Sequence, residues 1–154
     1  MARNLLYLSD RLEIIRRIDK LAVENKRLWG KMSVNEMVCH LGDQIQIALG
    51  KVELRPMNSL MGRTVIKHLV LLGMPTPKEK ISTAPEIDQA KGKGTRPENL
   101  VDDCANLKNI IAEFVSTDTH FVWAPHPFFG RLSKKQWGRL AFIHMDHHLK
   151  QFSS

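Results

Sequence analysis

Two histidines lie one helical turn apart in an otherwise apolar stripe near the end of the chain. The stretch 133–152 has the apolar period of a helix, and at about 100° per residue His144 and His148 fall on its inward arc. The other members of this arc are Trp137, Leu140, Ala141 and Phe152. Side chains at i and i+4 are neighbours on a helix, so both rings can point at one ion. Neutral imidazole is a favoured ligand for Zn, Ni, Cu and Fe, and the spacing therefore indicates a transition-metal site.

A third protein ligand is expected, because a catalytic metal site generally has three protein ligands and one open position. His40 is the first candidate: it borders the inner face of another predicted long helix, and bundles build metal sites from facing helices. His126, in an aromatic loop just before the last helix, is the second candidate. Single histidines such as His68 and His120 are best explained as surface or hydrogen-bonded core residues, and neither enters the predicted site.

Long amphipathic helices must position these residues. The capping boxes Ser33 to Glu36 and Ser133 to Gln136 fix the starts of two of them. The predicted long helices are 9 to about 29, about 34–49, 97 to about 116, and 133–152, and a shorter one is 58–73. Ser9 is the expected cap of the first helix, and Pro97 is expected in the first turn of the third long one. No convincing strand pattern is present, so we predict an all-α fold, a four-helix bundle with one short extra helix.

The segment from Met74 to Arg96 has a different composition from the rest of the chain. It contains three prolines and two glycines and shows no sustained apolar period. This pattern predicts a long excursion over the surface.

Length, charge and cysteine content narrow the class of protein. A chain of 154 residues with 43% hydrophobic content predicts one domain, 1–154. The net charge of +7 suits anionic partners, but no basic helix with interleaved aromatics is present, so a small-molecule substrate is favoured over nucleic acid. Cys39 and Cys104 form no CxxC pair and indicate a reducing compartment. Without a signal peptide or a long apolar run, we expect a cytoplasmic protein that does not enter a membrane.

A homodimer is a further expectation, since single bundles can pair through their outer helix faces. Ile143 and Phe142 point off the main stripe of the last helix and could serve this purpose. Expansion of the core explains them equally well.

Two motifs resemble a known family. They are Trp29-Gly-Lys-Met-Ser-Val-Asn-Glu-Met-Val-Cys-His40-Leu and His144-Met-Asp-His147-His148-Leu-Lys-Gln151. Together they resemble the DinB-like superfamily of damage-inducible and thiol-transferase-like four-helix bundles. The loop His126-Pro-Phe-Phe-Gly130 and the ending His147-His148-Leu-Lys-Gln-Phe look closest to a subgroup of it without an assigned function. The resemblance spans most of the chain.

The resemblance implies a divalent ion, Ni or Zn first, on His40, His144 and His148, with open positions for water or substrate. It makes His147 a flanking residue, which agrees with a position about 80° round the helix from the stripe centre. It makes Gln151 a residue that either orients a ligand or packs the helix. Asp43, at i+3 from His40, could orient that ring from outside the ligand set, although a solvated helix acid is the commoner explanation.

Characterised relatives in that superfamily often join low-molecular-weight thiols to electrophiles. We therefore expect a metal-dependent S-transferase in which the ion lowers the pKa of a bound thiol. One alternative is a metal-dependent hydrolase that activates water at the same open site. Others are a non-catalytic, stress-related metal-binding or interaction bundle and, from the positive charge, an anion or nucleic-acid binder whose affinity falls steeply with salt.

Overall fold

The computed structural model describes residues 2–56, 61–74, 85–91, 93–118 and 120–154. Within these ranges the chain is helical and contains no β-strand, which confirms the predicted all-α bundle. The α-helices are α1 (Leu8–Asp19), α2 (Val34–Ala48), α3 (Lys67–Leu72), α4 (Leu100–Ser116) and α5 (Lys134–Gln151). A π-helical segment, Gly62–Ile66, leads into α3, and two short 3-10 turns, Pro85–Ile87 and Gln89–Lys91, precede α4.

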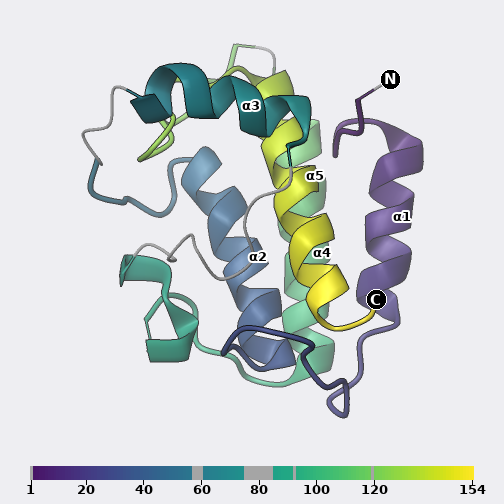
Figure 1. Cartoon of the computed structure of the whole chain (residues 1–154). Helices are drawn as coiled ribbons and strands as arrows, with labels where there is room; N and C mark the ends of the chain where they lie inside the picture. The colour runs from purple at the N-terminus through teal and green to yellow at the C-terminus, as the bar shows by residue number, and fades with distance from the viewer. Residues whose placement is uncertain (1, 57–60, 75–84, 92, 119) are drawn as a thin grey trace.

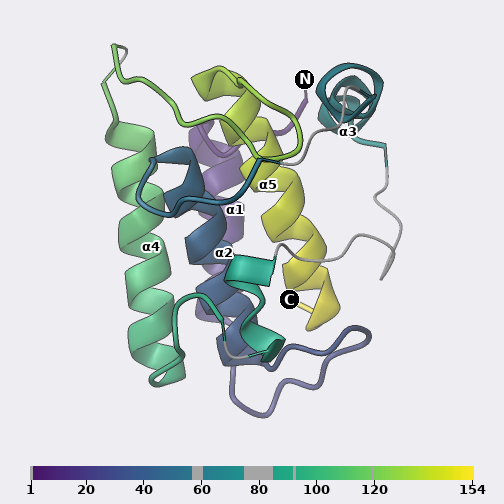
Figure 2. The same cartoon turned by 90° about the vertical axis from the view of Figure 1, so that its left-hand side faces the viewer.

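Four helices stand side by side and α3 lies across one end of them (Figure 1). Figure 2 shows α3 end-on, at a steep angle to the other axes. Helix α2 packs against α4 and α5, while α1 packs against α5 and α4. Helices α1, α4 and α5 each contribute one apolar face to a shared core, while α2 is buried on most sides. The largest fully buried side chains of these helices are Ile14, Ile18, Met37, Leu41, Ile45, Leu107, Ile111, Phe114, Trp137 and Met145.

Both predicted capping boxes are present. The Ser33 hydroxyl accepts from the backbone N–H of Glu36, and the Glu36 carboxylate accepts from the backbone N–H of Ser33. Ser133 and Gln136 make the same reciprocal pair at the start of α5. These bonds satisfy first-turn amides that have no partner inside the helix. They set the rotational phase of α2 and α5, and with it the direction of the histidines.

Helix α1 is much shorter than predicted. It ends at Asp19 rather than near Trp29, and Ser9 lies inside it, because the N-cap residue is Tyr7. Beyond Asp19 the backbone bonds elsewhere: the N–H of Ala22 donates to Asn25 Oδ1, and the N–H of Leu28 donates to the carbonyl of Gln151. The segment after α1 therefore packs against the end of α5 instead of continuing the helix.

The other predicted boundaries are closer to the structure. Helix α4 begins at Leu100 because Asn99 caps it by accepting from the N–H of Asp102, so Pro97 precedes the helix rather than lying in its first turn. The helical segment predicted over 58–73 is observed over 61–72, and Gly73, with φ +91°, ends it. Residues 57–60 lie outside the described ranges, as do 75–84 and 92 of the predicted surface excursion.

The described part of that excursion is not purely a surface segment. Ile87 and Gln89 are buried, and the turn Gln89–Lys91 packs against α2. No helix in the described ranges is both long enough and apolar enough to cross a bilayer.

Candidate metal centre

Three histidines converge between two facing helices. His40 comes from α2, and His144 and His148 come from successive turns of α5. One nitrogen from each ring can be chosen so that all three lie within 4.8 Å of one another. The closest pair is Nε2 of His40 and Nε2 of His144, which are 3.1 Å apart. The structure thus brings together the three residues that the sequence put forward as ligands.

The three rings differ in their exposure. His40 is only 4% exposed, whereas His144 and His148 are partly exposed. Burial lowers the pKa of all three rings. The neighbouring histidines lower it further at His144 and His148, and the pKa of His148 falls to about 3. The rings are therefore neutral at neutral pH, which is the form that binds a metal ion.

Gln151 fixes the orientation of His148. Its Nε2 donates to the backbone carbonyl of Trp29, so Oε1 is the atom that faces His148, 3.0 Å from Nδ1. An amide oxygen only accepts, so Nδ1 of His148 carries the hydrogen and Nε2 keeps its lone pair for an ion. Gln151 is 3% exposed, and it both packs the end of α5 and orients the His148 ring.

The remaining two rings leave hydrogen-bonding capacity unused. Between the Nε2 atoms of His40 and His144 only one hydrogen can be shared, and the buried Nδ1 of each ring has no hydrogen-bond partner among the described residues. A divalent ion would instead use the lone pairs of all three rings. Zn–N bonds of about 2.0–2.1 Å place tetrahedral ligand atoms about 3.3 Å apart, close to the observed 3.1 Å pair. One nitrogen of each of the three rings lies within 4.8 Å of the other two, so the donor set fits an ion.

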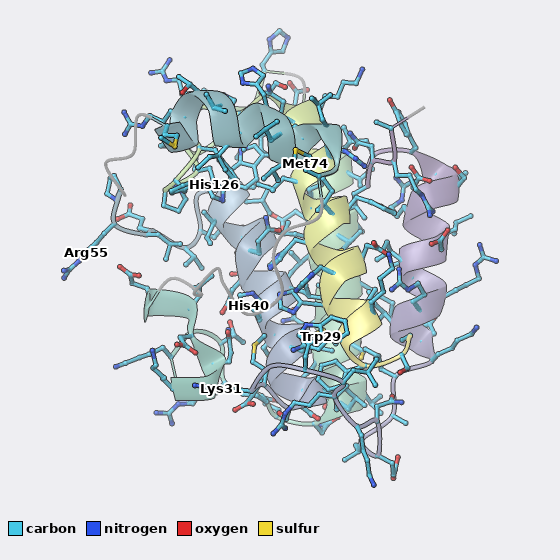
Figure 3. The ribbon with its side chains drawn as sticks, viewed as in Figure 1. Trp29, Lys31, His40, Arg55, Met74 and His126 are labelled. Carbon is cyan, nitrogen blue, oxygen red and sulfur yellow. The ribbon has the colours of Figure 1, made fainter. Side chains whose placement is uncertain are left out.

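His126 lies outside this cluster, toward α3 (Figure 3). Its Nδ1 accepts from the backbone N–H groups of Phe128 and Phe129, both at 3.1 Å, and its ring stacks on Phe129. Burial lowers the pKa of His126 to about 4. The lone pair that a metal would need at Nδ1 is already used to hold the turn, so the structure gives His126 a role in the loop.

The other histidines also stay apart from the three. His147 lies on the flank, and its ring contacts Trp29 and His148 edge to face, with centroids 5.8 and 5.1 Å away. His68 contacts the carbonyl of Thr64 on the exposed side of the π-helical segment, and His120 is exposed. The structure also places Phe142 in the core, where the Arg3 guanidinium covers its ring at 4.6 Å.

Asp43 is not a solvated acid. It is 1% exposed and accepts three hydrogen bonds, from Gln89 Nε2 at 2.5 Å, Thr95 N at 2.9 Å and Thr95 Oγ1 at 2.5 Å. None of these is to the His40 ring. Sequence reasoning missed Gln89 and Thr95, because their partner is about fifty residues away and their own segment shows no periodic pattern.

The fold and the cluster together define a class of protein, an all-α bundle in which facing helices present three histidines that could hold a metal ion. The chain belongs to the family described as "Protein of unknown function (DUF1569)", whose model matches residues 1–154. No curated protein and no solved structure matches it.

Proposed function

We propose that the chain is a metal-dependent enzyme of the DinB-like type. In this proposal His40, His144 and His148 hold a divalent transition-metal ion, Ni or Zn first, and the reaction is transfer of a thiol to an electrophilic small molecule. The observation that carries the metal site is the convergence of three neutral imidazoles from two facing helices within 4.8 Å. The thiol chemistry is supported by the resemblance of the two histidine motifs to that superfamily, which also suggests the metals.

The chain's own residues prepare the ligand set. Burial keeps the imidazoles unprotonated, and Gln151 holds His148 with Nε2 free. In this proposal a substrate reaches the ion from the side of His144 and His148, which are partly exposed. A divalent ion bound there supplies Lewis acidity, which lowers the pKa of a bound thiol and favours the thiolate nucleophile. The net charge of +7 favours an acidic thiol.

The first test is metal binding by protein purified without a histidine tag. Elemental analysis and titration with Zn²⁺ and Ni²⁺ should give about one equivalent per chain, as expected of a three-ligand site. His148→Ala removes a ligand and should weaken binding by more than about 100-fold, beyond the usual effect of losing an orienting residue. His147→Ala is the matched control, because it removes the adjacent histidine of the same helix, and it should retain the metal. A wild-type chain that binds neither ion would end the proposal.

The second test assigns the chemistry. The metal-loaded protein is incubated with low-molecular-weight thiols and activated electrophiles, and conjugates are measured by mass spectrometry. Conjugation that His148→Ala lacks and His147→Ala keeps would support thiol transfer. Cleavage of esters or amides by water without a thiol would reassign the site to a hydrolase, and metal binding without either reaction would favour a non-catalytic bundle.

A further inference from the structure

Just before α4 the chain returns to α2 in a short segment, residues 85–91 and 93–95, which we call the strap. Figures 1 and 2 both show its two helical turns beside α2. Ile87 and Gln89 of the strap are buried, although the sequence around them shows no apolar period. The strap therefore covers part of the helix that supplies His40.

Asp43 anchors the strap. Its carboxylate accepts hydrogen bonds from the side chain of Gln89 and from both the backbone N–H and the hydroxyl of Thr95. The fit is close at Gly94, which has φ +74°, since a Cβ there would lie 2.5 Å from Asp43 Oδ2 and from Gln89 Nε2. A buried carboxylate that accepts three hydrogen bonds holds its donors in defined positions, unlike a solvated charge.

Asp43 lies one helical turn after His40, so the anchored strap lies beside the turn of α2 that carries the His40 ring. Nε2 of His40 faces His144, so the ring nitrogen left for a partner outside the cluster is Nδ1. That Nδ1 is buried and has no hydrogen-bond partner among the described residues. Gln89 Oε1 is itself buried without a hydrogen-bond partner among the described residues. Metal-binding histidines usually donate their second N–H to such an oxygen, because this fixes the tautomer and the ring direction.

We propose that Asp43 is a positioning residue for the metal centre. By holding Gln89 of the strap, it keeps the Oε1 of that side chain available as the acceptor for the Nδ1 hydrogen of His40, so that Nε2 faces the ion. His40 and His148 are then oriented in the same manner, His40 by the strap and His148 by Gln151. This inference rests on the proposed metal site, but it makes a separate statement about how that site is held.

The test compares Asp43→Ala with Asp43→Asn. The amide can keep its oxygen toward Gln89 and the Thr95 N–H while its NH₂ donates to the Thr95 hydroxyl, so Asn preserves the anchor and Ala removes it. Zn²⁺ affinity is measured by competition with a chelator. Asp43→Ala should bind Zn²⁺ about 10- to 100-fold more weakly, and Asp43→Asn should bind close to wild type.

A second readout reports the tautomer itself. Nitrogen-15 NMR of labelled histidines in the metal-free protein should show His40 with its hydrogen on Nδ1 in the wild type and in Asp43→Asn. In Asp43→Ala the hydrogen should be distributed over both nitrogens. A purely structural role of Asp43 would change stability without changing this signature.

Gly94→Ala provides a variant that keeps Asp43, in case Asp43→Ala does not fold. The added methyl group displaces the anchoring side chains and should also weaken Zn²⁺ binding. Gly50→Ala is its matched control, since Gly50 has nearly the same φ, +72°, but its nearest neighbour to an added Cβ is 3.9 Å away. If the wild-type protein does not bind Zn²⁺, the metal site itself is rejected. Wild-type affinity and an unchanged His40 tautomer in folded Asp43→Ala or Gly94→Ala would reject the positioning role alone.

Discussion

At the scale of single residues, His126 shows how burial of an imidazole makes stability depend on pH. Its pKa is about 4 in the folded protein, below the ordinary value of 6.5. Between these values the unfolded chain binds a proton that the folded chain does not. As far as His126 is concerned, the free energy of unfolding therefore keeps its full value above about pH 6.5 and decreases as the pH falls toward 4.

We expect His126→Asn to make the stability less sensitive to acid. The Asn Oδ1 can take the place of Nδ1 as acceptor for the Phe128 and Phe129 amides without titrating. The free energy of unfolding, measured in urea from about pH 7 down to about pH 4.5, should fall less steeply than in wild type, by at most about 1.4 kcal/mol per pH unit. Slopes that coincide would show that His126 does not contribute.

Sequence reasoning reached part of the candidate site and not the rest, for a physical reason. His144 and His148 follow from the helical period alone, and His40 from the phase that a capping box gives to α2. Gln151 lies on the last turn of the same helix as His148, so the sequence could also predict its place beside that ring. The partners of Asp43 could not be found this way, since a bond across the fold to an aperiodic segment leaves no local pattern.

At the scale of the elements, the starts of α2 and α5 could be predicted from the sequence, whereas the end of α1 could not. A capping box acts within four residues, and both boxes form as expected. After α1 ends at Asp19, the N–H of Leu28 donates to the carbonyl of Gln151, a residue far along the chain, and no local pattern indicates that contact. Similarly, α4 begins where Asn99 can accept an amide, although Pro97 is compatible with an earlier start.

A pair of serine substitutions tests this difference. Ser33→Ala removes the cap of α2 and should lower the free energy of unfolding by about 1 kcal/mol. Ser9→Ala should cause no such loss, because Ser9 is exposed inside α1 and does not cap it. Denaturant unfolding of both variants is the measurement. A comparable loss in Ser9→Ala would contradict the observed start of α1.

At the scale of the whole molecule, the start of the chain is fastened to its last helix. The N–H of Leu5 donates to the carbonyl of Gly138, the Asn4 side chain donates to the carbonyl of Lys135, and Leu5 is fully buried. At Gly138 an added methyl group would collide with Asn4 Oδ1 and Leu6 Cγ. The absence of a side chain at Gly138 therefore allows the two ends of the sequence to pack together.

Gly138→Ala should destabilise the protein by about 1–3 kcal/mol, the usual effect of overpacking. Gly42→Ala is the control within α2, where the nearest atom is the flexible end of Ile110 at 3.3 Å and the gain in helix propensity is about 1 kcal/mol. It should be neutral or stabilising in thermal unfolding. Equal effects at the two sites would mean that the N-terminal contact moves aside at little cost.

The histidine cluster also bears on the connectivity of the chain. His40 and His144 are 104 positions apart, and both cysteines are free thiols. An ion shared by these rings would close a loop of that length, which is the topological role of a disulfide, yet it could be removed by a chelator. If the unfolded chain binds the ion weakly, folding and metal occupancy become a single linked equilibrium, set by the free metal concentration around the protein.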